Sequence, residues 1–509
     1  MRRAHESPRR RRAVRNLGVT LLLLPMLAGP AGALAQQSAR ESEAWTPALS
    51  MKYFAIRGTA LSPDGRQVAY VVREPIMEGK KSEYRSQIWV ASADGSRNVQ
   101  FTRGEKSSSN PSFSPDGRWL AFTSARPTDG KPGGEKAKSQ VWLLPLAGGE
   151  ARPATRAESG VEAYRWSPDG TRIAYTMRDP KTKEEKKAEE EKRDVILVDR
   201  NFKDAHLYVV PVDPGAEEPP EGTRLTAGSF HVTGFDWSPD GARIAFAHQS
   251  DPRLNTRSRD GDLSTVAVPA DLEAAGEPGA GIPLVTGAGV ESDPRFSPDG
   301  RWVAFVSTGK RPEPVGLGDL YVVPAEGGEP RALPLTPDRA GGLLGWSGDG
   351  REVFVSQTLH TTRHVLAVPV DGGEVRQVSS GDGVVGSVSF TPSADEMAFT
   401  WQTTDTPWDV YVSPTARYAP SRVTDIHAEV PRPRMGRTEL LSWTAPDGTP
   451  VEGLLTYPVD YEKGRRVPLI LNVHGGPAGA FVQSFTGAPS VYMLQYFAQR
   501  GFAILRANP

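Results

Sequence analysis

A short turn motif recurs along most of this sequence, and it limits the possible folds more than any other feature. Ser-Pro-Asp-Gly follows a large apolar residue five times, and two altered copies come after these. The first three copies start 52 and 53 residues apart. With the apolar residue included, the copies are 61–65, 113–117, 166–170, 237–241, 296–300, 346–350 and 390–395.

Each copy predicts a tight turn between two strands. Proline presets φ, aspartate can bond the backbone ahead of it, and glycine takes the φ > 0 position. A strand follows at once, as in Val68-Ala69-Tyr70 and Ile173-Ala174-Tyr175, and a further strand appears downstream, as at 320–323. A second Gly-rich turn, such as Glu326-Gly327-Gly328, comes next. The repeating unit is therefore a small antiparallel sheet.

Repeats of about 40–50 residues with four strands each are typical of propeller blades. A single blade cannot bury both of its faces, so blades that pack around an axis share a core and leave only short edges. The sequence predicts a seven-bladed β-propeller over residues 50–430. A linear solenoid is the alternative, but β-solenoids use much shorter repeats.

The N-terminus has the pattern of a signal peptide. Seven arginines lie in residues 1–35, an apolar stretch covers Leu17 to Ala28, and Ala33-Leu34-Ala35 has small residues at the two positions read at cleavage. The sequence predicts a signal peptide over residues 1–35 and export to the periplasm or the extracellular space. An uncleaved anchor is the alternative, but the apolar stretch is short for spanning a bilayer. No membrane association is expected after cleavage.

Charge and composition exclude several classes of function. Without residues 1–35 the chain has more acidic than basic residues, which disfavours a nucleic-acid partner. The sequence has no cysteine, so thiolate zinc sites and cysteine nucleophiles are excluded. His360 and His364 are four residues apart but lie in a strand-rich region, where that spacing does not form a shared helical face. We therefore expect no metal site.

One insertion interrupts the repeat. The serines of the third and fourth motif copies are 71 residues apart, and the extra length includes 181–193, which is rich in Lys and Glu. Such mixed-charge runs are usually solvated helices or loops. The alternative is an acidic patch, Glu189-Glu190-Glu191, that binds the amino terminus of a substrate.

After residue 425 the pattern changes, and residues 431–434 form a proline-containing linker. A hairpin is predicted around Pro446-Asp447-Gly448. Residues 467–473 are almost continuously apolar, which is typical of a parallel strand buried on both faces. A helix over 492–499, ended by Gly501, and another buried strand from Phe502 come next. This order predicts the start of an α/β-hydrolase domain over residues 436–509.

His474-Gly475-Gly476-Pro477 comes directly after the apolar strand and begins its connection to the predicted helix. Glycines let backbone N–H groups approach a developing negative oxygen in a site that excludes water. His474, Gly475 and Gly476 are therefore the candidate oxyanion-binding residues.

The repeated turns, the linker and Val473-His474-Gly475-Gly476-Pro477 together resemble the prolyl oligopeptidase family, and within it the acylaminoacyl-peptidase-like and dipeptidyl-peptidase-like branches. This resemblance implies a serine peptidase that uses a Ser-Asp-His triad and acyl-enzyme chemistry with no metal or cofactor. It also implies a propeller that restricts access to short peptides. His474 occupies the position where some members place a tyrosine donor. Either its imidazole or only the nearby backbone could serve.

The nucleophile of this fold lies on a later elbow, Gly-x-Ser-x-Gly, and the Asp and His follow it. The nearest match, 345–349, lacks the final glycine and is an altered blade turn. The triad is therefore expected beyond Pro509. This predicts that the chain is an N-terminal fragment, inactive by itself and prone to aggregate.

The propeller repeat also resembles the periplasmic propeller of the Tol system, so a non-catalytic binding protein is the alternative function. That alternative does not explain the apolar strand followed by His-Gly-Gly-Pro. Cleavage specificity and oligomeric state stay open at this point.

Overall fold

The computed structural model places most of the chain. All elements given below belong to one compact unit formed by residues 44–430 and 434–509. The predicted signal peptide and Pro477 lie outside the described residues. No helix in the described part is long and apolar enough to cross a membrane. The structure describes residues 44–128, 137–193, 195, 198–213, 215–216, 218–309, 318–338, 341–476 and 479–508.

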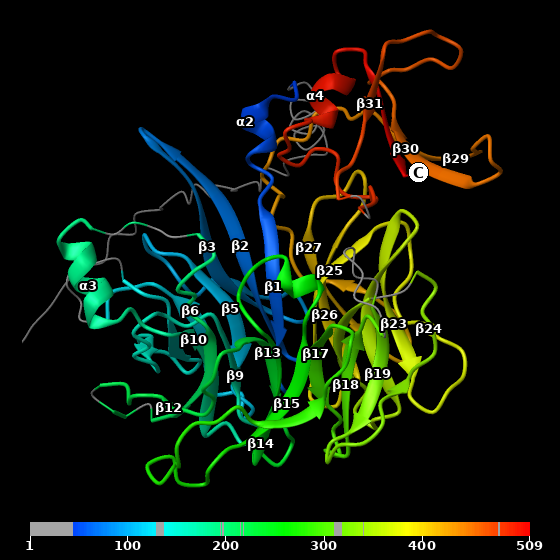
Figure 1. Ribbon diagram of the computed structural model, residues 1–509. Coiled ribbons are helices and arrows are strands. Elements are labelled where there is room, and N and C mark those ends of the chain that lie inside the picture. Colours follow the sequence, from blue (N-terminus) through cyan, green and yellow to red (C-terminus); the bar gives the residue numbers. More distant parts are fainter. Residues whose placement is uncertain are drawn as a thin grey trace, which may run out of the picture. The chain divides into compact units, whose positions relative to one another are not determined.

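Antiparallel sheets built from strands that are adjacent in the sequence follow one another along the chain (Figure 1). This is the unit that the repeat predicts. The first two sheets are β1 (Ala55–Leu61), β2 (Gln67–Glu78), β3 (Lys81–Ser92) and β4 (Asn98–Gln100), then β5 (Ser108–Phe113), β6 (Trp119–Ser124), β7 (Gln140–Pro145) and β8 (Arg152–Pro153).

Three more four-stranded sheets continue the array with the same neighbour order. They are β9 (Ala163–Trp166), β10 (Arg172–Arg178), β11 (Ala205–Pro211) and β12 (Thr223–Arg224); β13 (His231–Trp237), β14 (Arg243–Gln249), β15 (Asp262–Ala267) and β16 (Ile282–Val285); and β17 (Glu291–Phe296), β18 (Trp302–Ser307), β19 (Asp319–Pro324) and β20 (Arg331–Ala332). A short 3₁₀ helix, η1 (Thr256–Ser258), lies between β14 and β15.

The last sheet of the array has eight strands. A single parallel residue pair, Arg363 with Val384, joins its two halves, so each half keeps the four-stranded pattern of the other sheets. Its strands are β21 (Gly342–Trp346), β22 (Glu352–Leu359), β23 (Thr362–Pro369), β24 (Arg376–Gln377), β25 (Val384–Phe390), β26 (Glu396–Gln402), β27 (Asp409–Pro414) and β28 (Ser421–Arg422).

The repeated turn has the geometry that its residues predict. In six copies the serine Oγ donates to the aspartate Oδ1 over 2.5–2.7 Å and accepts from a backbone N–H five residues on over 2.9–3.0 Å. The glycine of these copies has φ between +68° and +71°. In the altered last copy Ala394 takes this position at φ +53°, and Thr391 replaces the serine. The side chains thus close the turn before the next strand begins.

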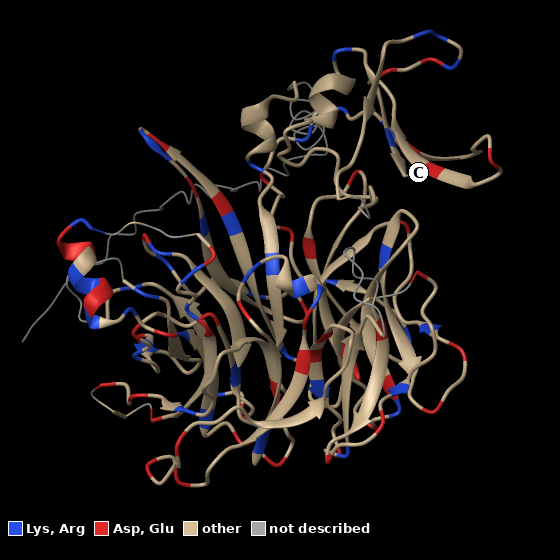
Figure 2. Cartoon of the chain, viewed as in Figure 1, with Lys and Arg blue, Asp and Glu red and all other residues tan. Residues whose placement is uncertain are grey.

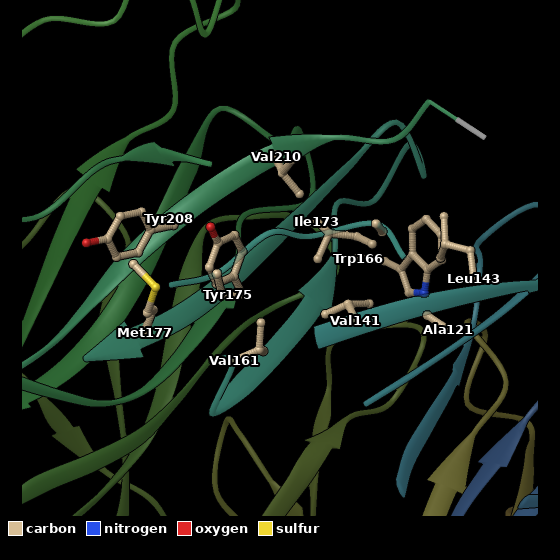
Figure 3. Close-up of a cluster of buried hydrophobic side chains, with 12 residues drawn as sticks. Ala121, Val141, Leu143, Val161, Trp166, Ile173, Tyr175, Met177, Tyr208 and Val210 are labelled. Carbon is tan, nitrogen blue, oxygen red and sulfur yellow. The ribbon is translucent and has the colours of Figure 1, made fainter. Parts of the chain in front are cut away.

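The large apolar residue before each turn packs between neighbouring sheets. Figure 3 shows Trp166 of β9 in a buried cluster with Leu143 of β7 and Ile173 of β10. The indole N–H of Trp166 also donates to the carbonyl of Ser112 in the preceding sheet, at 3.4 Å. Trp237 and Trp346 bond the carbonyls of Arg165 and Arg295 in the same way. Burial of apolar area, with one hydrogen bond per tryptophan, therefore couples successive sheets.

The first and last sheets of the array also pack together. Ile56 and Val68 share a buried cluster with Ala398 and Val410. The backbone N–H of Gly58 in β1 donates to Ser387 Oγ in β25 at 2.9 Å. The strands β1 to β4 pair only with one another, so side-chain packing and such hydrogen bonds, rather than a shared strand, join the two ends.

A second repeated contact, which we call the outer-strand hydroxyl pair, joins the third strand of a sheet to the second residue after its outer strand. A buried Thr or Ser hydroxyl bonds a buried polar side chain of the third strand. The same hydroxyl accepts the backbone N–H of the residue that follows this polar residue in the third strand, at 2.8–3.0 Å. The pairs are Thr102 with Gln87, Thr155 with Gln140, Thr226 with His206, Ser379 with His364, and Thr424 with Asp409.

The hydroxyl pair of His206 predicts a pH-dependent stability. Burial, with a smaller effect of Arg224, lowers the pKa of His206 to about 4. An unfolded histidine titrates near about 6.5, so between these pH values only the unfolded chain gains the proton. The free energy of unfolding should therefore fall as pH drops from 6.5 to 4, on the order of 2 kcal/mol.

The variant His206→Gln tests this, because glutamine fills the equivalent place in the pairs of Gln87 and Gln140. Urea unfolding at pH 7 and at pH 4.5 should show a smaller acid loss in the variant than in the wild type. His360→Gln, at a side chain that is 80% exposed, is the control. Equal acid losses in His206→Gln and wild type would contradict the prediction.

The C-terminal segment forms a mixed sheet with the order β29-β30-β32-β31. Its strands are β29 (Thr438–Thr444), β30 (Pro450–Thr456), β31 (Leu469–Asn472) and β32 (Ala503–Asn508). The hairpin at 446–448 is present, with Gly448 at φ +87°. The expected helix over 492–499 is shorter, α4 (Leu494–Ala498), because no side chain caps its N-terminus. Gly501 follows it at φ +84°, as expected.

The helix α2 (Pro47–Ser50) precedes β1, and Trp45 beside it packs with Phe485.

The expectation that 467–473 is buried on both faces is wrong for this structure. β31 is an edge strand, paired only with β32. Leu469, Leu471 and Val473 are 57%, 58% and 74% exposed, whereas Ile470 packs against α4 and β32. Alternate side chains point to opposite faces of a strand, and no described element covers the second face of β31.

Candidate oxyanion site

The candidate loop lies at one edge of the C-terminal sheet. β31 and β32 are parallel, with Leu469 paired to Ala503 and Asn472 paired to Arg506. The carboxyl ends of parallel strands meet at the same edge, which is where α/β folds bind ligands. His474 to Gly476 follow β31 there, next to the end of β32.

His474 is half-buried, and its Nδ1 lies 3.2 Å from the carbonyl oxygen of Gly475. When the proton is on Nδ1, it donates to that carbonyl and leaves Nε2 as an acceptor. The ring meets the Phe481 ring edge to face, with 5.4 Å between centroids. The imidazole is thus held against its own loop.

The end of β32 fixes the far side of the loop. The Asn508 side chain accepts from the Phe481 N–H at 2.7 Å and donates to the Phe481 carbonyl at 2.9 Å. The guanidinium of Arg506 lies 5.9 Å from the centre of the Phe481 ring. Arg506 and Asn508 are two residues apart on one strand, so they share a face. Sequence reasoning missed both, because nothing but their place at a strand end marks them.

Arg506 is only 5% exposed, and burial lowers its pKa to about 10. Its Nε and Nη2 atoms bond no group in the described part of the chain. Buried guanidinium N–H groups without acceptors are costly, so these two nitrogens favour an anionic or carbonyl partner near the loop.

The glycines of the loop have different roles. Gly476 has φ +131°, which disfavours any residue with a Cβ. Gly475 has open space where a Cβ would lie. A Cβ on Gly479 would come within 2.5 Å of the Gly475 carbonyl, so the return of the chain also requires glycine.

The backbone N–H groups of the loop, those of His474, Gly475 and Gly476, make no hydrogen bond within the described structure. Donors at such a turn stabilise the negative oxygen of a tetrahedral intermediate in acyl transfer. The three predicted residues, which are consecutive in the sequence, lie at one sheet edge with these donors unused.

The weaker sequence matches have structural roles. Ser347 of the elbow-like match donates to Asp349 at 2.7 Å as a blade turn. His360 is exposed at φ +54° near Glu452, whereas His364 is buried and bonds Ser379. These two histidines do not meet, and within the described ranges no group of three metal-ligating side chains comes together.

The charged insertion forms the helix α3 (Lys183–Glu190), and none of its residues is buried. Thr182 caps it through a reciprocal bond with Glu185. Figure 2 shows basic and acidic residues side by side on this helix. Glu189 pairs with Lys181 at 2.6 Å, and Glu191 pairs with Arg193. Because two of the three carboxylates of the alternative patch have cationic partners and no residue of α3 is buried, the solvated helix is favoured over a substrate-binding acidic patch.

Known proteins resemble both segments of the chain. A family model described as the lipoprotein LpqB β-propeller domain matches residues 32–183. An uncharacterized peptidase of Bacillus subtilis is 27% identical over 512 residues, covering 88% of this chain and 68% of the relative. A dipeptidyl-peptidase 5 of Porphyromonas gingivalis is 23% identical over 516 residues, covering 97% of this chain and 72% of the relative.

Solved structures share the fold. An acylaminoacyl peptidase of Pyrococcus horikoshii has a TM-score of 0.68 at 17% identity, covering 92% of this chain and 67% of that chain. A prolyl endopeptidase has a TM-score of 0.60 at 15% identity, covering 94% of this chain and 67% of that chain. At such identities the likeness shows the fold: a β-propeller joined to the sheet of a hydrolase domain.

Proposed function

We propose that this chain, which is related to the peptidases of the prolyl oligopeptidase family, is part of an exported serine peptidase that cleaves short peptides through an acyl-enzyme. In this proposal residues 50–430 form a seven-bladed propeller and residues 436–509 begin the α/β-hydrolase domain. The propeller limits access to the site, and His474, Gly475 and Gly476 supply its first oxyanion donors. Neither a metal nor a cofactor takes part.

One observation carries the proposal: a loop with unused N–H donors ends a parallel strand immediately after a propeller array. In acyl transfer a hydroxyl nucleophile attacks the carbonyl carbon, and the carbonyl oxygen becomes the oxyanion. The loop would hold that oxygen. Asn508, through Phe481, would keep the loop in place.

We further propose that the Ser-Asp-His triad lies in a segment that the relatives contain and this chain does not span. The chain has no Gly-x-Ser-x-Gly sequence and covers 68% and 72% of the two relatives. The exposed apolar row Leu469, Leu471 and Val473 supports this, because a further strand and covering helices of a parallel sheet would bury it. By itself the 509-residue chain would then not cleave peptides.

Export is part of the proposal. The predicted signal peptide supports it, and the matching propeller model, described as a lipoprotein domain, starts at residue 32, close to the predicted cleavage site. The alternative, a non-catalytic binding propeller, explains the array but not the loop on β31. The relatives also align across both segments, which disfavours that alternative.

The test is to express the full reading frame, including any codons after Pro509, and to treat the product with a fluorophosphonate that labels activated serines. We expect labelling, cleavage of fluorogenic di- and tripeptides, and recovery from the periplasm or medium. The 509-residue chain, treated in parallel, should stay unlabelled. A folded full product without labelling, or a stop codon directly after Pro509, would leave the binding propeller as the function.

A further inference from the structure

A cavity of about 780 Å³ lies among β5, β9, β13 and β17. These are the first strands of four consecutive sheets, and they are labelled in Figure 1. Its volume is in the range of small-molecule and peptide sites. Tyr164, Trp166 and Phe235 give it apolar walls, and Arg165, Asp236 and Arg295 give it charged groups. None of the residues that line it belongs to the loop at His474.

Most charged groups around the cavity already have partners. Arg165 lies 3.8 Å from Asp236, and Asp236 also accepts the backbone N–H of Phe296 at 3.0 Å. Glu162 accepts from Arg178 at 2.6 Å. Asp293 is exposed and has φ +53° in an irregular part of β17.

Arg295 is different. In the described residues its guanidinium makes one hydrogen bond, to the carbonyl of Pro294 at 2.8 Å, and no carboxylate lies within 4.0 Å of it. Burial, and then the neighbouring Arg165, lower the pKa of Arg295, while Asp236 and Asp293 oppose this. A guanidinium has five N–H donors in a planar fork, so most of these donors are free to take a ligand.

The planar fork of Arg matches a carboxylate, and charge-assisted bonds of this kind are among the strongest in proteins. A second cavity of about 610 Å³ shares the lining residues Glu162, Ala163, Thr233 and Asp293 with the first. Together the two cavities give an extended chain of a few residues room to reach Arg295.

We propose that Arg295, supported by Arg165, binds the α-carboxylate of a short peptide inside the propeller. This inference rests on the proposed peptidase function for its ligand class. The site would favour peptides with a free C-terminus.

The test uses the full reading-frame product after fluorophosphonate treatment, so that bound peptide is not consumed. Calorimetry measures binding of Ala-Ala-Phe, of its C-terminal amide, and of Ala-Asp-Phe amide, whose only carboxylate is on a side chain. We expect the acid to bind about 10-fold more tightly than either amide, the effect of one charge-assisted interaction. Equal binding of acid and amide, or tight binding of Ala-Asp-Phe amide, would overturn the proposal.

Variants test whether Arg295 causes the preference for the free C-terminal carboxylate. Arg295→Gln should weaken binding of the acid about 10-fold and leave the amide unchanged, and Arg295→Lys should fall between. Arg301→Gln is the matched control. Arg295 lies before the turn motif at 296–300 and Arg301 directly after it, and the Arg301 side chain is 77% exposed beside Asp299. Thermal melting by circular dichroism confirms that each variant is folded. Discrimination that survives in folded Arg295→Gln contradicts the assignment.

The proposed peptidase function and the proposed carboxylate site can be contradicted independently of each other. Absence of fluorophosphonate labelling removes the peptidase function, while the binding comparison can still be made because nothing consumes the peptide. Labelling without any preference for the acid removes only the carboxylate site.

Discussion

Replacing Gly475 by proline is expected to lower kcat of the full reading-frame peptidase by about 10²–10³-fold with little change in KM. Proline has no N–H, so the substitution removes one donor from the candidate oxyanion loop. Such donors act mainly on the transition state, and loss of one typically costs about 3–4 kcal/mol of its stabilisation. Steady-state hydrolysis of a fluorogenic peptide measures the effect.

Gly475→Ala is the matched control, because it keeps the N–H and a Cβ at this position meets nothing within 4 Å. It should retain activity close to wild type. His474→Ala separates the two interpretations of the site: a fall in kcat similar to that of the proline variant assigns the imidazole a direct role, and a small fall leaves the backbone as the donor. Equal losses of kcat in Gly475→Ala and Gly475→Pro would contradict the assignment of the Gly475 N–H as a donor to the oxyanion.

Asp409→Ala is expected to give the largest loss of stability in the array, about 3 kcal/mol. Asp409 has no exposed surface. One of its oxygens accepts from Thr424 Oγ1 at 2.8 Å and from the Ile426 N–H at 3.2 Å, while the other meets the Arg422 guanidinium. Removing the carboxylate leaves the buried Thr424 hydroxyl and the Ile426 N–H without this acceptor, next to the junction of the first and last sheets.

Chemical unfolding followed by tryptophan fluorescence measures this loss. Asp425→Asn is the control, because Asp425 pairs with the same Arg422 but its side chain is 57% exposed. Exposed pairs contribute about 0–1 kcal/mol, so the control should unfold near wild type. If Asp409→Ala and Asp425→Asn have the same free energy of unfolding, the buried pair of Asp409 and Thr424 does not stabilise the array more than an exposed ion pair does.

Local chemistry made the turns and the loop predictable. Ser-Pro-Asp-Gly closes within a few residues, so its geometry at Gly65 or Gly300 depends little on the rest of the chain. The same holds for Thr182 at the start of α3 and for Gly448 in the hairpin. The candidate loop was found because glycines after an apolar strand are a local pattern too.

The sequence alone therefore determined the repeat, the sheet unit and the position of His474, Gly475 and Gly476. Only the tertiary structure decided which distant groups meet. Arg295 is one arginine among many in the sequence, and only the packing of four inner strands places it in a cavity without a carboxylate partner. Thr424 and Asp409 likewise find each other only across paired strands. The exposure of Leu469 and Leu471 also depends on what covers β31, which an apolar run cannot specify. The physical reason is that turns depend on bonds between near neighbours, whereas burial and pairing of charges depend on the whole fold.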